Sequence, residues 1–140
     1  MPSEWFIGFV DDASRHTCNL ASAAWVIYLP SGQLVASGSA CLGPATNNVV
    51  EYRAIIELLW DALSWGITQL EVRIDSQLVV SQLSRAYQVR NPILLREFMQ
   101  VRLLERNFEF NTFNHIPRNQ NSLIDAYANY ILDWHLTHFL

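Results

Sequence analysis

The chain has 140 residues, of which 51% are hydrophobic and 16% are charged, with five glycines and five prolines. This length and composition predict a single domain over residues 1–140 and exclude disordered, collagen-like and low-complexity protein. The net charge of −4, with arginine as the only basic residue besides histidine, argues against a non-specific nucleic-acid coating protein, but it leaves room for a local site that meets phosphates through metal ions.

Three short segments in the N-terminal third are predicted to be strands. Residues 5–10 form an apolar run that ends at two aspartates and is typical of a strand buried on both faces. After a polar loop, strands are predicted at residues 23–29 and 34–42. The tight turn at residues 30–33 favours antiparallel pairing of these two strands.

From residue 48 the hydrophobic period becomes helical. Residues 48–65 predict one amphipathic helix that stops at Gly66, a C-cap signal. Residues 70–75 alternate between apolar and polar, which predicts a half-buried strand. Ser76 can then cap a short helix over residues 77–83.

The last third predicts two more helices around a fifth strand. Pro92 is suited to the first position of a helix that ends near Arg106. Residues 108–115 alternate again and predict a strand, which is followed by a loop to residue 120 and a helix from residue 121 to the C-terminus. The order βββαβααβα predicts an α/β fold with a mixed five-stranded sheet, whose first three strands are antiparallel, and helices on both faces.

The sequence shows neither a secretion signal nor a membrane-spanning segment. No apolar run reaches the length of a membrane span, and no secretory signal is visible at the N-terminus. Cys18 and Cys41 are too few for a disulfide framework or a zinc site. We therefore expect free thiols in a reducing intracellular compartment, cytoplasm or nucleus, and a monomer with no membrane partner.

Four acidic residues at the ends of predicted elements are candidate metal ligands: Asp11, Glu51, Asp75 and Asp125. Asp11 and Asp75 end predicted strands, and ligands of open α/β sheets bind near the carboxyl ends of strands. Glu51 heads the apolar helix stripe Ile55, Leu58, Ala62 and Trp65, and Asp125 heads a similar stripe. A carboxylate there is costly unless it is paired or binds a metal, and convergent carboxylates suit Mg²⁺ or Mn²⁺.

Each acid taken alone also has a simpler explanation. Asp75 could cap the helix that follows its strand. Glu51 could lie on the surface in the first turn of its helix, where the helix dipole favours a negative charge. Each acid alone is weak evidence, whereas four carboxylates at element ends, two of them heading core stripes, indicate oxygen ligands that converge on one site.

Four segments carry a more specific signal: VDDASR at residues 10–15, ATNNVVEYRA at 45–54, VRIDSQLVV at 72–80 and HIPRNQNSLIDAYAN at 115–129. In order, spacing and element type they resemble the signature blocks of type 1 ribonuclease H. The chain is most similar to the form found in archaeal and plant proteins and in retroelement polyproteins. The resemblance covers essentially the whole chain and implies a ribonuclease H-like fold.

The resemblance also implies an activity and a set of site residues. The activity is endonucleolytic hydrolysis of the RNA strand of an RNA–DNA hybrid with two Mg²⁺ or Mn²⁺ ions. The four acids named above are the implied catalytic metal ligands. His115 matches the catalytic loop histidine, a role that Arg118 could share or replace. The implied substrate-binding residues are Thr46, Asn47, Asn48 and Gln77.

Three departures from the family pattern keep other functions open. Asp12 stands where the family usually has glycine, in the turn expected after Asp11, where its bulk and negative charge could displace Asp11. Residues 16–20 lack a Gly/Pro-rich run, and the basic helical protrusion of some bacterial members is absent. The first departure, with the acidic charge, motivates an alternative: a catalytically weakened nucleic-acid-binding or scaffold module of the same fold. A 3′–5′ exonuclease ranks lower, because such enzymes usually carry Asp-x-Glu on the first strand and this chain has Asp11-Asp12-Ala13.

Overall fold

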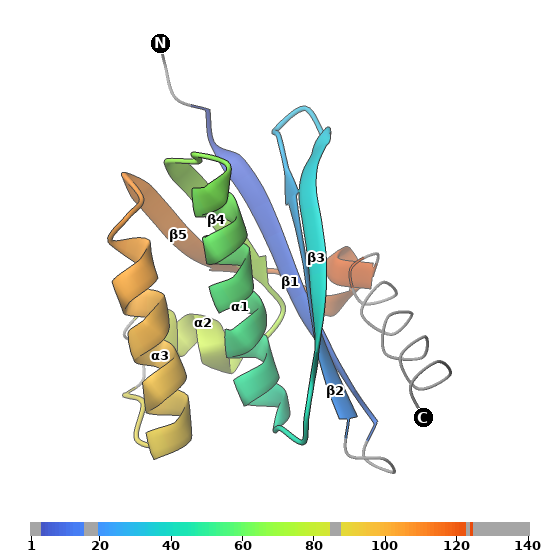
Figure 1. The fold of residues 1–140 in the computed structure, drawn as a ribbon, viewed down its shortest axis with the longest axis vertical. Helices are drawn as coiled ribbons and strands as arrows, with labels where there is room; N and C mark the ends of the chain where they lie inside the picture. Colours follow the sequence, from blue (N-terminus) through green and yellow to red (C-terminus); the bar gives the residue numbers. More distant parts are fainter. Residues whose placement is uncertain (1–3, 16–19, 85–87, 123, 125–140) are drawn as a thin grey trace.

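The computed structural model describes residues 4–15, 20–84, 88–122 and 124. The predicted order of elements is confirmed within these residues (Figure 1). The elements are β1 (Phe6–Arg15), β2 (Leu20–Tyr28), β3 (Leu34–Leu42), α1 (Asn47–Ser64), β4 (Gln69–Ile74), α2 (Gln77–Leu83), α3 (Pro92–Glu105), β5 (Phe110–His115) and a 3₁₀ helix (Arg118–Asn121). The predicted C-terminal helix lies almost entirely outside the described residues.

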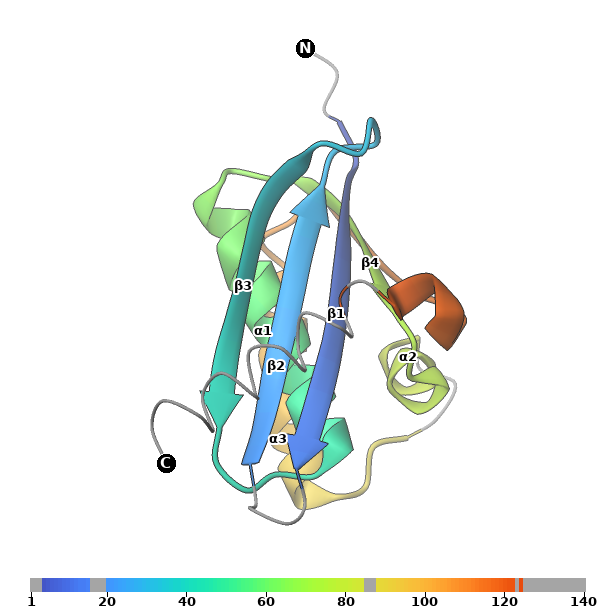
Figure 2. The same cartoon turned by 90° about the vertical axis from the view of Figure 1, so that its right-hand side faces the viewer.

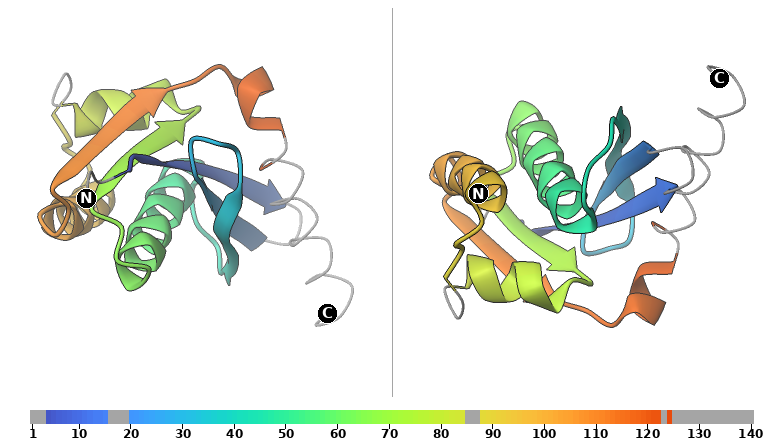
Figure 3. Two further views of the ribbon diagram at one scale, coloured as in Figure 1. Left: turned by 90° about the horizontal axis from the view of Figure 1, so that it is seen from above. Right: turned by 90° about the horizontal axis from the view of Figure 1, so that it is seen from below.

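The five strands form one mixed sheet in the order β3-β2-β1-β4-β5. β1, β2 and β3 pair antiparallel, whereas β4 runs parallel to both β1 and β5. Figure 2 shows β3, β2 and β1 side by side, and Figure 3 shows α1 and α3 on one face of the sheet with the 3₁₀ helix on the other. The predicted mixed sheet is therefore confirmed.

β1 is longer than predicted, and this changes the position of Asp11. We expected the strand to end at residue 10, but its pairing with β2 continues to Arg15. Aspartate is a poor strand former, yet Asp11 and Asp12 lie opposite Ala24 and Ala23, and this ladder carries the strand past them. Asp11 thus lies inside a strand rather than at its end.

The helix termini follow the predicted signals. Ser76 caps α2 and Asn91 caps α3, each through a side-chain oxygen that accepts a backbone N–H of the first turn. Thr46 does the same for α1. Gly66 has a φ of 75°, a left-handed conformation that glycine adopts without strain, and it ends α1 as predicted.

α1 supplies more residues to the buried core than any other described element. Its buried residues include Ile55, Leu58 and Ala62, three members of the predicted stripe. The fourth, Trp65, is 61% exposed, so its predicted burial is wrong. The helix already ends at Ser64, and Trp65 is the C-cap residue, outside the helical period that would have turned it inward.

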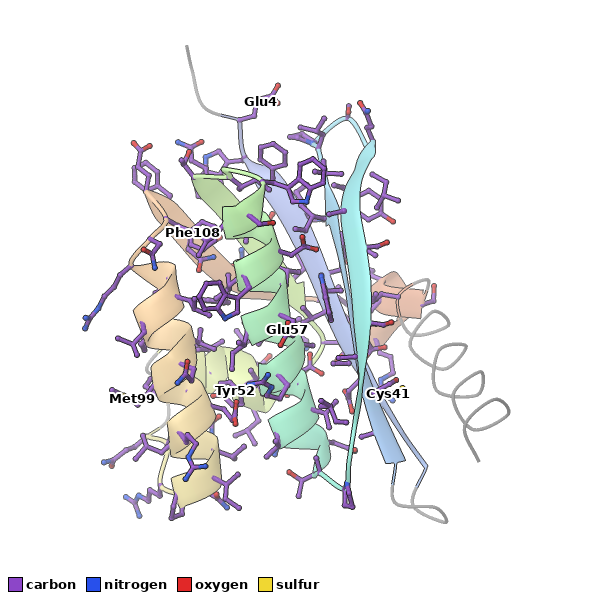
Figure 4. The ribbon with its side chains drawn as sticks, viewed as in Figure 1. Glu4, Cys41, Tyr52, Glu57, Met99 and Phe108 are labelled. Atoms are coloured by element: carbon purple, nitrogen blue, oxygen red, sulfur yellow. The ribbon has the colours of Figure 1, made fainter. Side chains whose placement is uncertain are left out.

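Two polar contacts join α1 to other elements. Tyr52, labelled in Figure 4, is fully buried and donates a hydrogen bond from its hydroxyl to Gln82 Oε1 of α2 at 2.6 Å. Burial raises the pKa of the Tyr52 hydroxyl to about 12, so it stays a donor throughout the physiological range. Trp25 of β2 donates from Nε1 to Asp61 Oδ2 at 3.0 Å.

The structure also bears on the cysteines and on possible membrane-spanning helices. Cys41, exposed on β3 (Figure 4), forms no disulfide with any described residue, and Cys18 lies outside the described residues. Among the helices that the structure describes, none combines the length and the apolar character needed to cross a bilayer.

Because Gly38 has no side chain, the Trp25 indole packs directly against its backbone. The two residues are partners on β3 and β2, and a Cβ atom at residue 38 would overlap the indole ring. We predict that Gly38→Ala displaces Trp25, breaks its bond to Asp61 and lowers the free energy of unfolding by about 1–3 kcal/mol, measured by urea denaturation. Gly43→Ala is the matched control, because no atom of a described residue lies within 4 Å of the added Cβ. Equal stabilities of the two variants would contradict this packing.

Candidate active site

β1 and α1 bring three carboxylates into one cluster. Single carboxylate oxygens of Asp11, Asp12 and Glu51 all lie within 4.8 Å of one another. Asp11 is 3% exposed and Glu51 is 2% exposed. Because α1 begins at Asn47, Glu51 lies beyond its first turn, and the alternative of a surface glutamate favoured by the helix dipole is wrong.

Asp75 reaches the same place from the neighbouring strand. The parallel register pairs Phe9 of β1 with Arg73 of β4, so Asp11 and Asp75, two residues further on, lie level with each other. The Asp75 side chain is only 5% exposed. Ser76 rather than Asp75 caps α2, so the capping alternative for Asp75 is wrong as well.

The 3₁₀ helix holds Asp75 from its other side. Asn121 donates from Nδ2 to Asp75 Oδ2 at 3.2 Å and to the Val10 carbonyl oxygen at 3.0 Å. The guanidinium of Arg118 lies 4.0 Å from Asp75 Oδ2, although the Arg118 side chain is 86% exposed. The 3₁₀ helix thus links the strand that carries Asp11 to the acid that follows β4.

The acids act strongly on Glu51. Its pKa is raised well above the usual range, first by burial, then by a hydrogen bond with Asp12 and by the negative charges of Asp12, Asp75 and Asp11. Two like charges 4.8 Å apart repel by about 3 kcal/mol at an effective dielectric constant of about 20. The acids therefore cannot all ionise cheaply without a cation.

The cluster fits a divalent metal ion. Glu51 Oε1 is buried and has no hydrogen-bond partner among the described residues. A buried carboxylate oxygen in this condition, beside other carboxylates, is a hard oxygen ligand of the kind that Mg²⁺ and Mn²⁺ prefer. Of the four predicted acids, Asp11 and Glu51 lie in this cluster, Asp75 lies close enough for its charge to act on Glu51, and Asp125 lies outside the described residues.

The other predicted site residues lie on elements that end near these acids. His115 is the last residue of β5 and pairs with Ile74, directly before Asp75. It is exposed, as is Arg118. His115 ends β5 and Arg118 begins the 3₁₀ helix. Figure 3 shows β5 leading into this helix.

The predicted substrate-binding residues lie at two helix N-termini. Thr46 is the N-cap of α1, and Asn47 and Asn48 are its first two residues. Gln77 begins α2 and donates from Nε2 to Ser81 Oγ at 3.1 Å. Thr46, Asn47 and Gln77 are exposed and Asn48 is half-buried, so their polar groups can meet a ligand.

Sequence reasoning missed two residues of the site. Asp12 was expected only to disturb the turn after Asp11, yet it belongs to the carboxylate cluster. The alternation of β1 could have indicated this, because Asp12 continues the series Gly8 and Val10, which faces α1. Asn121 was expected only to begin a helix, and no pattern in the sequence indicates that its amide binds Asp75.

The raised pKa of Glu51 predicts a pH-dependent loss of stability in the metal-free protein. In the unfolded chain Glu51 ionises in the usual range, whereas the folded protein keeps its proton to higher pH, so stability falls as pH rises from the unfolded to the folded pKa. We predict that Glu51→Gln melts at a higher temperature than wild type in EDTA, by a margin that grows with pH above about 4.3.

The matched control is Glu57→Gln on the same helix, whose carboxylate pairs with Arg53 at the surface. This variant should show no such pH-dependent gain. A Glu51→Gln protein with the same melting temperature as wild type from acidic to alkaline pH would contradict the electrostatic account.

Comparison with known proteins supports one family. Residues 9–131 match the family model described as reverse transcriptase-like. The chain is 39% identical over 125 residues to Ribonuclease HI of Halobacterium salinarum, covering 89% of this chain and 63% of that protein. It is 38% identical over 124 residues to a bifunctional protein of Mycobacterium tuberculosis, covering 88% of this chain and 34% of that protein. The chain thus spans less than two thirds of the length of these relatives.

Solved structures agree with this result. The RNase H1 of Halobacterium salinarum superimposes with a TM-score of 0.87 at 38% identity, over 92% of this chain and 98% of that one. The N-terminal RNase H domain of the Mycobacterium tuberculosis protein gives a TM-score of 0.90 at 32% identity, over 99% and 100%. LC11-RNase H1, solved in complex with an RNA/DNA hybrid, gives 0.87 at 32% identity, over 94% and 99%.

The fold, the buried acids and these matches agree with one another. They confirm the resemblance to type 1 ribonuclease H that the four sequence segments indicated. The chain belongs to the reverse transcriptase-like family, and its fold is that of RNase H1.

Proposed function

We propose that this chain is an endonuclease that hydrolyses the RNA strand of RNA–DNA hybrids with the help of two Mg²⁺ or Mn²⁺ ions. The observation that carries the proposal is the burial of Asp11 and Glu51 in one cluster, level with Asp75. A relative named Ribonuclease HI and an RNase H1 structure with a bound RNA/DNA hybrid support the choice of substrate.

The acids would divide the two ions between them. Asp11 would contribute to holding both ions, Glu51 and Asp75 would hold one of them, and Asp125 would help to hold the other. When bound, two such ions supply a hydroxide nucleophile and stabilise the leaving oxygen of a phosphodiester. The protein's part is to fix the carboxylates in place, which β1, α1 and the Asn121 hydrogen bonds do.

Polar groups around the acids would orient the hybrid. Amides such as those of Asn47, Asn48 and Gln77 can both donate and accept, which suits contacts with a 2′-hydroxyl and with base edges. The N-terminus of the 18-residue helix α1, with the Thr46 hydroxyl as its cap, suits a backbone phosphate. The exposed guanidinium of Arg118 suits a second phosphate, and the exposed imidazole of His115 suits proton transfer.

We also propose that residues 1–140 form a single domain that works as a monomer in a reducing compartment. The catalytically weakened module remains the second candidate, because Asp12 adds a negative charge beside Asp11. The argument for this weakened module was that Asp12 could displace Asp11. Asp11 nevertheless lies in the cluster with Glu51, which weakens that argument. Binding of Mg²⁺ or Mn²⁺ without hybrid cleavage would favour that module.

Cleavage of a labelled hybrid tests the proposal. We predict RNA-strand cleavage at internal positions with Mg²⁺ or Mn²⁺, and none of duplex DNA. Asp11→Asn and Asp75→Asn should each lower kcat roughly 10²-fold or more, because each removes an anionic oxygen ligand of the ions that assist hydrolysis while the fold persists. Circular dichroism checks the fold, and near-normal turnover by Asp75→Asn would contradict the assignment. Cleavage from the 3′ end alone would favour the exonuclease.

The loop roles separate in steady-state kinetics. We predict that His115→Ala lowers kcat by about 10²-fold with little change in KM, because it removes a proton acceptor. Arg118→Ala should instead raise KM, because it removes a phosphate contact. The opposite pattern, with kcat lost in Arg118→Ala alone, would transfer the catalytic loop role from His115 to Arg118.

A further inference from the structure

The register of β1 directs Asp12 toward α1. Side chains alternate between the faces of a strand, and the face that carries Asp12 also carries Gly8 and Val10. A Cβ atom at Gly8 would lie 2.7 Å from Leu58 Cδ1 of α1, and Val10 is fully buried in the core. Glu51 precedes Leu58 by about two helical turns, with Ile55 between them, and so lies on the same face of α1. Asp12 is therefore placed to meet Glu51.

The side chains do meet there. Asp12 hydrogen-bonds to Glu51, and oxygens of both lie within 4.8 Å of an Asp11 oxygen. Asp12 is half-buried, while Glu51 is almost fully buried. Asp12 thus adds a third carboxylate to the pair formed by Asp11 of β1 and Glu51 of α1.

The Glu51 carboxylate supplies an independent sign of a ligand. Its Oε1 atom is buried and accepts no hydrogen bond from any described residue. Among the residues that the structure describes, the charged groups that act on Glu51 are the carboxylates of Asp12, Asp75 and Asp11. A buried oxygen surrounded by negative charge is suited to direct coordination of a cation.

We propose that Asp12 is an additional metal ligand, which joins Asp11 and Glu51 around one ion and makes that ion bind more tightly than the second. The presence of two ions rests on the proposed function, whereas the role of Asp12 does not follow from it. An added carboxylate raises affinity for a hard divalent cation, because both the number of oxygens and the ligand charge increase.

A role in positioning Glu51 is the competing explanation, because Asp12 hydrogen-bonds to it. Two substitutions separate the roles. Asp12→Asn keeps the size and a hydrogen-bonding group but removes the charge, whereas Asp12→Gly removes the whole side chain. If Asp12 only positions Glu51, the asparagine variant should bind cations as wild type does.

The experiment is a calorimetric titration of the metal-free chain with Mn²⁺ and, separately, with Mg²⁺. Wild type should show a tighter and a weaker ion. Both Asp12 variants should raise the Kd of the more tightly bound ion by about tenfold or more and leave the Kd of the other ion unchanged. Glu109→Gln is the charge-matched control, because Glu109 is exposed and its backbone bonds to Thr68, before β4 and away from Asp75. The rise in melting temperature with Mn²⁺ provides a second readout.

The outcomes separate this inference from the proposed function. If Asp12→Asn binds cations as tightly as wild type, the ligand role of Asp12 is overturned, whether or not Asp12→Gly binds them more weakly. The proposed endonuclease stands in that case. Weaker cation binding in both Asp12 variants, with no change in Glu109→Gln, supports the ligand role of Asp12. Wild type that binds neither cation overturns the two-ion endonuclease together with this inference.

Discussion

The packing of α1 against β1 is the constraint on which the site depends. It buries Glu51 beside Asp11 and Asp12 at a distance where like charges repel strongly. The apolar residues of α1 below Glu51, such as Ile55 and Leu58, fix the helix against the sheet and hold the carboxylate in a buried position beside the other acids. The hydrophobic core thus holds an arrangement of acids that their own electrostatics oppose.

This opposition connects stability with function. A buried acid with a raised pKa favours the unfolded chain as pH rises. A cation that binds only the folded arrangement would reverse that preference. The sheet contributes through its register, which sets Asp11 level with Asp75, and Asn121 joins the two strands by binding both Val10 and Asp75. The site is therefore preorganised by the backbone rather than assembled by its ligands.

Much of the fold and part of the site could be predicted from periodicity. Glu51 was identifiable because an acid at the head of an apolar helical stripe has few inexpensive explanations, and its burial bears this out. The extension of β1 past Asp11 could not be predicted, because local propensity favours an end there and only the ladder to β2 overrides it. For the same reason Asp12 was assigned to a turn. Trp65 was misplaced because the helical period was carried one residue beyond the helix.

The central claim is that the buried acids form a cage for divalent cations, and anomalous diffraction tests it most directly. Crystals of the chain grown with Mn²⁺ should give two anomalous peaks about 3.5–4 Å apart, each bounded by carboxylate oxygens of the cluster that contains Asp11 and Glu51. The account is contradicted if Mn²⁺ at saturating concentration gives no peak at these residues, or peaks only at other acids on the surface.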